Sequence, residues 1–159
     1  MTTKINRFFC SIIILVLLAF VAGKSFARDI PVRLIPLNDE VGLLDNQIVS
    51  DVSDICQQAY KDFKSEIAVL IIRSTDGINA NDYALRVFNH WGLGQAGINN
   101  GMLILFAIED RRVEIMPGSR YKSVFNSAFC NSLLTRNVIP EMRAGKFAFI
   151  IPVIISTEG

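Results

Sequence analysis

Histidine and cysteine are scarce in this sequence. It has one histidine, His90, and three cysteines among 159 residues. A zinc site needs several nitrogen or sulfur ligands, so this composition argues against zinc. His90 has no serine or cysteine partner at the spacing of a known nucleophile–base motif. No lysine–serine/threonine pair follows Gly92 and Gly94, which excludes a P-loop there.

An excess of basic residues is also missing. The chain has 16 basic and 15 acidic residues, a formal charge of +1. Lys4, Arg7 and Lys24 precede the first acidic residue, Asp29, so residues 28–159 carry 13 basic against 15 acidic residues, a formal charge of −2. Nucleic-acid binding requires a basic face. We therefore expect no nucleic-acid partner.

Residues 1–27 have the pattern of a secretory signal peptide. A positive start precedes an almost wholly apolar run of 16 residues, 8–23. Ser25 and Ala27 then place small side chains where signal peptidase cuts, before Arg28. Spanning a membrane takes roughly 20 apolar residues, so we expect cleavage, with an uncleaved anchor as the alternative. The protein is then exported to the periplasm or another extracytoplasmic space, and meets the membrane only through this segment if it is uncleaved.

The remaining 132 residues contain no repeat and no Pro/Gly-rich linker, so we expect one domain. Apolar periodicity and breaker residues predict an ordered series of elements. These are an extended segment 28–38, helix 46–64 capped by Asp45, strand 67–72, a helix from Asn79 or Asn81 to Trp91, strands 102–108 and 113–116, and helix 124–138 capped by Asn126. A strand–helix–strand crossover followed by a hairpin indicates an α/β fold. We expect a three-layer α/β/α sandwich, in which helices cover both faces of a small mixed β-sheet.

Two features of this domain allow more than one interpretation. Cys56 and Cys130 fall on apolar helical faces, where they form either a disulfide in an oxidising compartment or buried thiols. Residues 148–159 form a short tail whose apolar part surrounds Pro152. This tail is either a last element packed on the core or the remnant of a truncated gene.

Acidic residues gather where the predicted strands end. Asp39 precedes the first helix, Asp76 follows the first apolar strand, and Glu109 and Asp110 follow the second. Ligands of open α/β sheets bind beyond the carboxyl ends of parallel strands. Oxygen-rich clusters suit Ca²⁺ or Mg²⁺. The alternative is that these residues only form turns, with Glu109–Arg111 as a solvated hairpin turn.

Six segments of the chain form a pattern by their order and spacing. They are Asn38-Asp39-x-x-Gly42-Leu43-Leu44, Glu66-Ile67-Ala68-Val69, Asp82-Tyr83-Ala84-x-x-x-Phe88-x-x-Trp91-Gly92-x-Gly94, Asn100-Gly101-Met102-Leu103-Ile104-Leu105, Asp110-Arg111-x-Val113-x-Ile115 and Ile139-Pro140-x-Met142-Arg143-x-Gly145-x-Phe147. Together they resemble the TPM domain family, which is found in bacterial envelope and thylakoid-lumen proteins. Their order and spacing place the domain at residues 36–147. The resemblance implies a divalent-metal pocket or an acid-phosphatase-like activity, with Asp39, Glu109 and Asp110 as metal ligands.

The chain also departs from the family pattern. Glu109 replaces the first aspartate of the usual Asp-Asp-Arg turn, and Asn126 and Ser127 replace a threonine–aspartate pair. After the hairpin, residues 118–122 read Gly-Ser-Arg-Tyr-Lys where the family usually has glycine-tyrosine-glycine-leucine-glutamate. We expect Arg120 and Lys122 to bring positive charge near the acidic end, which weakens a metal site. Arg111 and Arg120 are accordingly candidates for binding an anionic group.

Two function classes remain open. The first is a metal-assisted phosphatase acting on phosphate esters, in which Asp39, Glu109 and Asp110 hold Ca²⁺ or Mg²⁺ and Arg111 contacts the phosphate. The second is a non-catalytic envelope module with a weak divalent-metal site, which binds a protein partner in assembly or quality control. We favour the second, because the sequence lacks a nucleophile–base pair and its acidic set is reduced.

Overall fold

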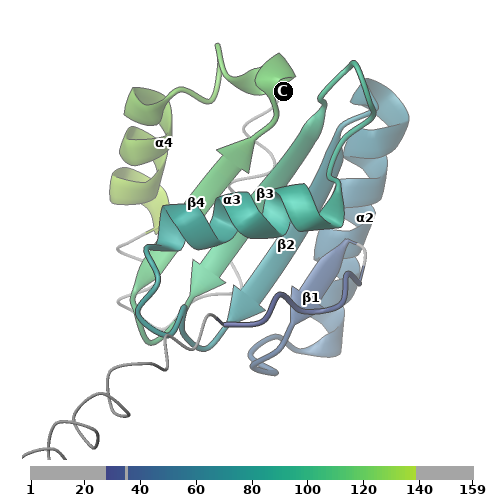
Figure 1. The fold of residues 1–159 in the computed structure, drawn as a ribbon. Helices are drawn as coiled ribbons and strands as arrows, with labels where there is room; N and C mark the ends of the chain where they lie inside the picture. The colour runs from purple at the N-terminus through teal and green to yellow at the C-terminus, as the bar shows by residue number, and fades with distance from the viewer. Residues whose placement is uncertain (1–27, 35, 139–159) are drawn as a thin grey trace, which may run out of the picture.

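The computed structural model describes residues 28–34 and 36–138 (Figure 1). The elements in chain order are β1 (Leu37–Asp39), α2 (Asn46–Phe63), β2 (Glu66–Ile72), α3 (Ala80–Trp91), β3 (Gly101–Ala107), β4 (Arg112–Pro117), the 3₁₀ turn η1 (Ser119–Tyr121), α4 (Ser127–Leu133) and the π-helical turn η2 (Leu134–Val138). The strands form one sheet in the order β1-β2-β3-β4. The first three strands are parallel and β4 is antiparallel, so the sheet is mixed.

The centre of the sheet is the long parallel pair β2–β3. Its register runs from Glu66 beside Gly101 to Ile72 beside Ala107. Almost every side chain of both strands is buried. Continuous apolar runs without alternation are typical of strands covered on both faces. The two strands predicted on this basis are confirmed.

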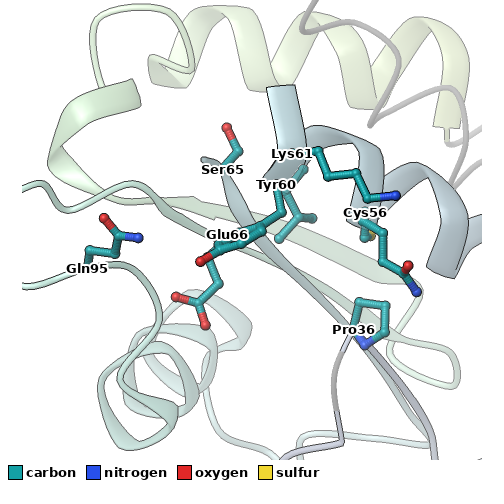
Figure 2. Close-up of a pocket in the computed structure, with 9 residues that line it drawn as sticks. Pro36, Cys56, Tyr60, Lys61, Ser65, Glu66 and Gln95 are labelled. Carbon is teal, nitrogen blue, oxygen red and sulfur yellow. The ribbon is translucent and has the colours of Figure 1, made fainter. Parts of the chain in front are cut away.

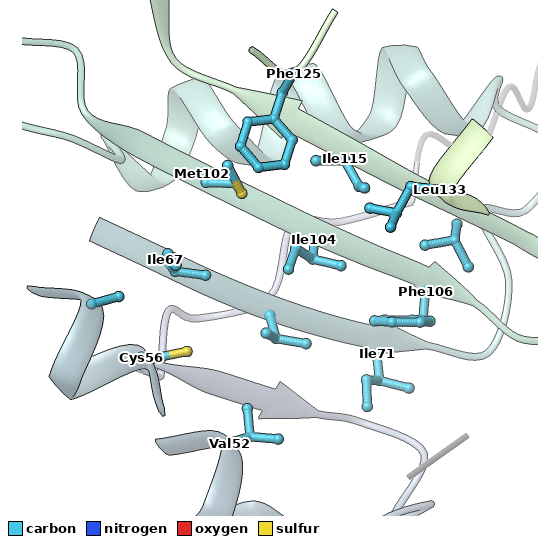
Figure 3. Packing of buried hydrophobic residues seen from close by; sticks show 13 residues of the cluster. Val52, Cys56, Ile67, Ile71, Met102, Ile104, Phe106, Ile115, Phe125 and Leu133 are labelled. Atoms are coloured by element: carbon cyan, nitrogen blue, oxygen red, sulfur yellow. The ribbon is translucent and has the colours of Figure 1, made fainter. Parts of the chain in front are cut away.

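Alternate residues of β2 and β3 point into two separate apolar clusters. Ile67, Val69 and Ile71 face a cluster that includes residues of α2 and α4 (Figure 3). Ala68, Leu70 and Ile72 face a second cluster, which is built with α3. Helices therefore cover both faces of the sheet, and the predicted α/β fold with a small mixed sheet is confirmed.

The helix ends follow the capping residues. Asp45 accepts from the Ile48 N–H (2.9 Å) at the start of α2, and Asn79 caps α3. Gly92 ends α3 in the left-handed region (φ +60°). Asn126 accepts from the Phe129 N–H (3.0 Å), as predicted, so α4 begins at Ser127. The predicted start at residue 124 was wrong, because residues 119–125 form turns before this cap.

The first strand is shorter than the extended segment predicted for residues 28–38. Only Leu37–Asp39 pair with β2. Residues 28–34 instead cross α3, where the Pro31 carbonyl accepts from the Trp91 indole N–H (2.9 Å) and the Asp29 carbonyl accepts from the Tyr83 hydroxyl (3.2 Å). This segment therefore covers α3.

Several sequence-based expectations fall partly or wholly outside the described residues. These are the signal peptide (1–27), the last of the six segments that resemble the TPM family (139–147) and the apolar tail (148–159). Within the described ranges, no helix is long and apolar enough to cross a membrane. Cys56 and Cys130 are both thiols, and burial raises the pKa of the Cys130 thiol.

The cap of α2 gives a direct test of this fold. Asp45→Ala should lower the free energy of unfolding by about 1 kcal/mol, because it removes the acceptor for a free N–H of the first turn. Urea denaturation measures the change. Asp54→Ala, at an exposed position of the same helix, is the control and should change it by less than about 0.5 kcal/mol. Equal effects of the two variants would contradict a capping role.

Candidate functional site

Asp39, at the carboxyl end of β1, holds the turn that leads into α2. Its carboxylate accepts from the N–H groups of Val41 (3.1 Å), Gly42 (2.9 Å) and Leu44 (2.9 Å). Gly42 adopts a positive φ (+67°) that glycine tolerates best. This predicted metal ligand is therefore largely engaged by its own loop.

Asp110 ties the hairpin after β3 to the loop after β2. Its carboxylate accepts from the Ser74 hydroxyl (2.8 Å) and the Thr75 N–H (2.7 Å), and the Thr75 hydroxyl lies 2.8 Å away. Partial burial opposes ionisation, but these hydrogen bonds and the positive charge of Arg28 outweigh it. They hold the pKa of the Asp110 carboxyl below its ordinary value. Asp110 is thus a negative charge at neutral pH, stabilised by neighbouring donors.

The other two residues of this turn face solvent. The Glu109 carboxylate lies 3.9 Å from Arg73 Nε, and both side chains are mostly exposed (65% and 72%). Such a pair contributes little to stability. Arg111 is exposed and has a positive φ (+54°), and its N–H closes the turn on the Ile108 carbonyl. The prediction of a hairpin turn at Glu109–Arg111 is confirmed.

Arg28 supplies a cation at this acidic end. Its guanidinium lies 2.7 Å from the Glu40 carboxylate and 3.4 Å from that of Asp76. Its side chain is mostly buried, and Tyr83 lies beside it. From the sequence, Arg28 is only the residue that follows the expected cleavage site. No local pattern connects it to carboxylates 12 and 48 residues away.

Arg120 lies at the opposite end of the sheet. The Gly118 N–H donates to the Gly101 carbonyl (2.7 Å), and the Arg120 N–H donates to that of Asn99 (3.3 Å). Because β4 is antiparallel, the chain leaving Pro117 returns to the beginning of β3. The expectation that Arg120 lies near the acidic end was therefore wrong. Arg111 and Arg120 are not brought together.

A groove of about 540 Å³ opens at this second end of the sheet, between α2 and the beginning of β2 (Figure 2). Cys56 and Tyr60 line it from α2, and Pro36 and Ile67 line it from the sheet. Lys61 also lines it. No local sequence pattern predicts this groove, since its walls come from segments distant in sequence.

Two exposed aromatic side chains lie near the end of α2, Tyr60 in the wall of the groove and Phe63 in that of a second hollow. Tyr60 is 46% exposed and Phe63 is 56% exposed, and the Lys64 ammonium lies 5.6 Å from the centre of the Tyr60 ring. A second hollow, of about 380 Å³, lies beyond Ser65 and is lined by Phe63, Arg120 and other residues. Exposed aromatic residues beside a hollow are typical of surfaces that bind other molecules.

A family model described as the TPM domain matches residues 37–149 of this chain. The chain belongs to the TPM domain family. The sequence-based resemblance is thus confirmed. Among curated proteins, none matches this chain.

Solved structures with the same fold come from several bacteria. The N-terminal domain of a protein from P. gingivalis has a TM-score of 0.69 at 23% identity, covering 77% of this chain and 79% of that one. The N-terminal domain of the cg2496 protein from Corynebacterium glutamicum has a TM-score of 0.59 at 16% identity, covering 87% and 85%. The BA42 protein from Bizionia argentinensis has a TM-score of 0.62 at 22% identity, covering 74% and 80%. At these identities, the likeness concerns the fold alone.

The acidic end of this TPM domain is a poor match for a divalent cation. In the part of the chain that the structure describes, no three His, Cys, Asp or Glu side chains are grouped to hold a metal ion. The carboxylates of Asp39 and Asp110 already accept several hydrogen bonds from the loops, and Arg28 adds positive charge. A Ca²⁺ or Mg²⁺ site at Asp39, Glu109 and Asp110 stays a prediction.

Two variants distinguish the hydrogen bonds of the Asp110 carboxylate from the effect of its negative charge alone. Asp110→Asn should lower the free energy of unfolding at pH 7 by about 2 kcal/mol, because the amide has one acceptor oxygen where the carboxylate uses both, one for the Ser74 hydroxyl and one for the Thr75 N–H. Glu109→Gln makes the same chemical change one residue earlier and should cost less than about 0.5 kcal/mol. Because the pKa of Asp110 is lowered in the folded state, its contribution is present above the ordinary value of 3.8. The gap between wild type and Asp110→Asn should close as the pH falls through the lower, folded value. A gap independent of pH would contradict this assignment.

Proposed function

We propose that this TPM domain protein is exported and acts as a non-catalytic module of the cell envelope that binds another protein during assembly or quality control. The groove beside α2 is the observation that carries the proposal. It combines a volume of about 540 Å³ with an apolar wall and an exposed tyrosine. Its size lies within the range of ligand-binding cavities.

The arrangement at the other end of the sheet supports the same proposal. Asp39 and Asp110 accept hydrogen bonds that fix two loops, so both have a structural task. His90 is exposed on α3, and none of the hydrogen bonds between described residues joins it to a nucleophile. Export rests on the charged start, apolar run and small residues at 1–27.

A metal-assisted phosphatase is the second candidate. It is favoured by the carboxylate of Asp110, which the lowered pKa keeps ionised, beside Glu109 and Arg111 in one turn. Bound there, a divalent cation would polarise a phosphate oxygen and activate water. Arg111 would then face the phosphate.

Binding at the groove can be tested by photocrosslinking in intact cells. The full chain would carry a benzophenone amino acid at Tyr60 or, as the control, at Leu85, an exposed apolar position on α3. A discrete adduct in the extracytoplasmic fraction from position 60 alone, competed away by purified residues 28–159, would support a binding module. Adducts of equal strength from both positions, or none from either, would count against it.

The enzyme alternative needs a metal titration. Purified residues 28–159 would be melted with and without millimolar Ca²⁺ or Mg²⁺, then assayed on a chromogenic phosphate ester. For a non-catalytic module we expect no turnover and a small thermal shift or none. Metal-dependent turnover that is lost in Asp110→Asn, but kept in Asp45→Asn at an acidic position outside the hairpin turn, would overturn the non-catalytic proposal.

A further inference from the structure

The edge of β2 is only partly paired. The ladder between β1 and β2 begins with Leu37 beside Val69. Within it, the Val69 N–H donates to the Pro36 carbonyl (2.8 Å) and the Glu40 N–H donates to the Ile71 carbonyl (3.0 Å). In a parallel pair, alternate residues of one strand bond to the same neighbour. Residues 69 and 71 of β2 therefore bond to β1.

Pro36 ends this ladder. By the same register, the Ile67 carbonyl is the next acceptor along β2, and residue 36 is the residue that would donate to it. Proline has no N–H, so it accepts from Val69 but cannot donate to Ile67. Among the described residues, β1 thus supplies no partner for the Ile67 carbonyl. Buried backbone acceptors require a partner, whether protein or solvent.

This incomplete edge lies in the wall of the groove beside α2. Pro36, Cys56 and Tyr60 line it (Figure 2), and Ile67 also belongs to its lining. The Ile67 side chain packs in the core cluster and the residue as a whole is only 3% exposed, so a segment can approach its backbone only from the groove that Ile67 lines. An extended segment lying in the groove would complete the ladder and rest its side chains on Tyr60.

The charged residues in and beside the groove indicate which side chains a bound segment would carry. Lys61 lines it, and Lys64 lies over the Tyr60 ring. Among the described residues that line the groove, Glu66 is the one with a carboxylate, and it is paired with Arg33 and accepts from the Gly94 N–H (2.8 Å). Lys61 is therefore the charge of the groove wall that a ligand would meet, with Lys64 near Tyr60, and both favour carboxylates.

We infer that the groove binds an extended, acidic peptide segment of a partner protein, which adds to the edge of β2 at Ile67. This inference rests on the proposed function and specifies its partner. Main-chain hydrogen bonds would give affinity, as in other cases of strand addition, while Lys61 would give the preference for acidic side chains.

Pro36→Ala is the variant that isolates the edge. Alanine restores an N–H at position 36, which lets β1 reach the Ile67 carbonyl and close the edge. The probe is acetyl-Val-Glu-Val-Glu-Val-amide, titrated into ¹⁵N-labelled residues 28–159 and followed by the amide resonances of Ile67 and Ala68. We expect saturable shifts in the wild type and about fivefold weaker binding in Pro36→Ala, the loss of one hydrogen bond. Pro31→Ala, outside the groove, is the matched control and should stay within twofold.

A lysine-bearing version of the probe should bind at least fivefold more weakly than the acidic one, and Lys61→Glu should reverse this order. No shift at Ile67 with millimolar acidic probe would overturn strand addition, while a Tyr60 crosslink would still support the binding module. Absence of the crosslink would remove the proposed function itself. If a chain ending at Phe147 binds the probe and the full chain does not, residues 148–159 fill the groove and an external peptide partner is excluded.

Discussion

The parallel pair β2–β3 is the constraint on which the rest of this structure depends. Both strands are apolar along nearly their whole length and are buried on both faces. A sheet of this kind is stable only if helices cover each face, and α2 with α4 on one side and α3 on the other do so. The two faces of these strands are buried and apolar, so they leave no place for a polar functional group. Polar and charged side chains therefore lie at the two ends of the sheet. One end carries the acidic loops, and the other carries the groove beside α2.

The charged side chains at the carboxyl ends of the strands mainly hold the adjacent loops in place. Asp39 and Asp110 each bind several donors in their own or a neighbouring loop, and Arg28 offsets part of the remaining charge. Burial raises the pKa of the Tyr83 phenol beside Arg28, although the arginine opposes this, so the phenol stays a neutral donor to the Asp29 carbonyl. This end resembles an acidic ligand site in composition, but most of its charges are already partnered within the protein.

The sequence was informative wherever the determining interactions are local. The helix caps Asp45, Asn79 and Asn126 accept from N–H groups two or three residues further along the chain, and Gly92 ends a helix. Each could therefore be predicted from neighbouring residues. The strands of the central pair were evident from their apolar runs. By contrast, the position of Arg120 depends on the direction of β4, and the contacts of Arg28 join residues up to 48 positions apart. The groove was missed for the same reason, because Pro36, Tyr60 and Ile67 meet only through sheet register and helix packing.

Pro36 determines how β2 is paired at the second end of the sheet. The same residue accepts from β2 and fails to donate to it, so the strand that begins the domain also leaves its neighbour incomplete. An unpaired edge ordinarily invites a second copy to pair with it, which leads to aggregation. Here the open part is short, and Lys61 and Lys64 stand beside it. A second copy would bring the same lysines to the contact and be repelled, whereas an acidic segment would be attracted. The charges that discourage self-association are thus the ones that give the groove its selectivity.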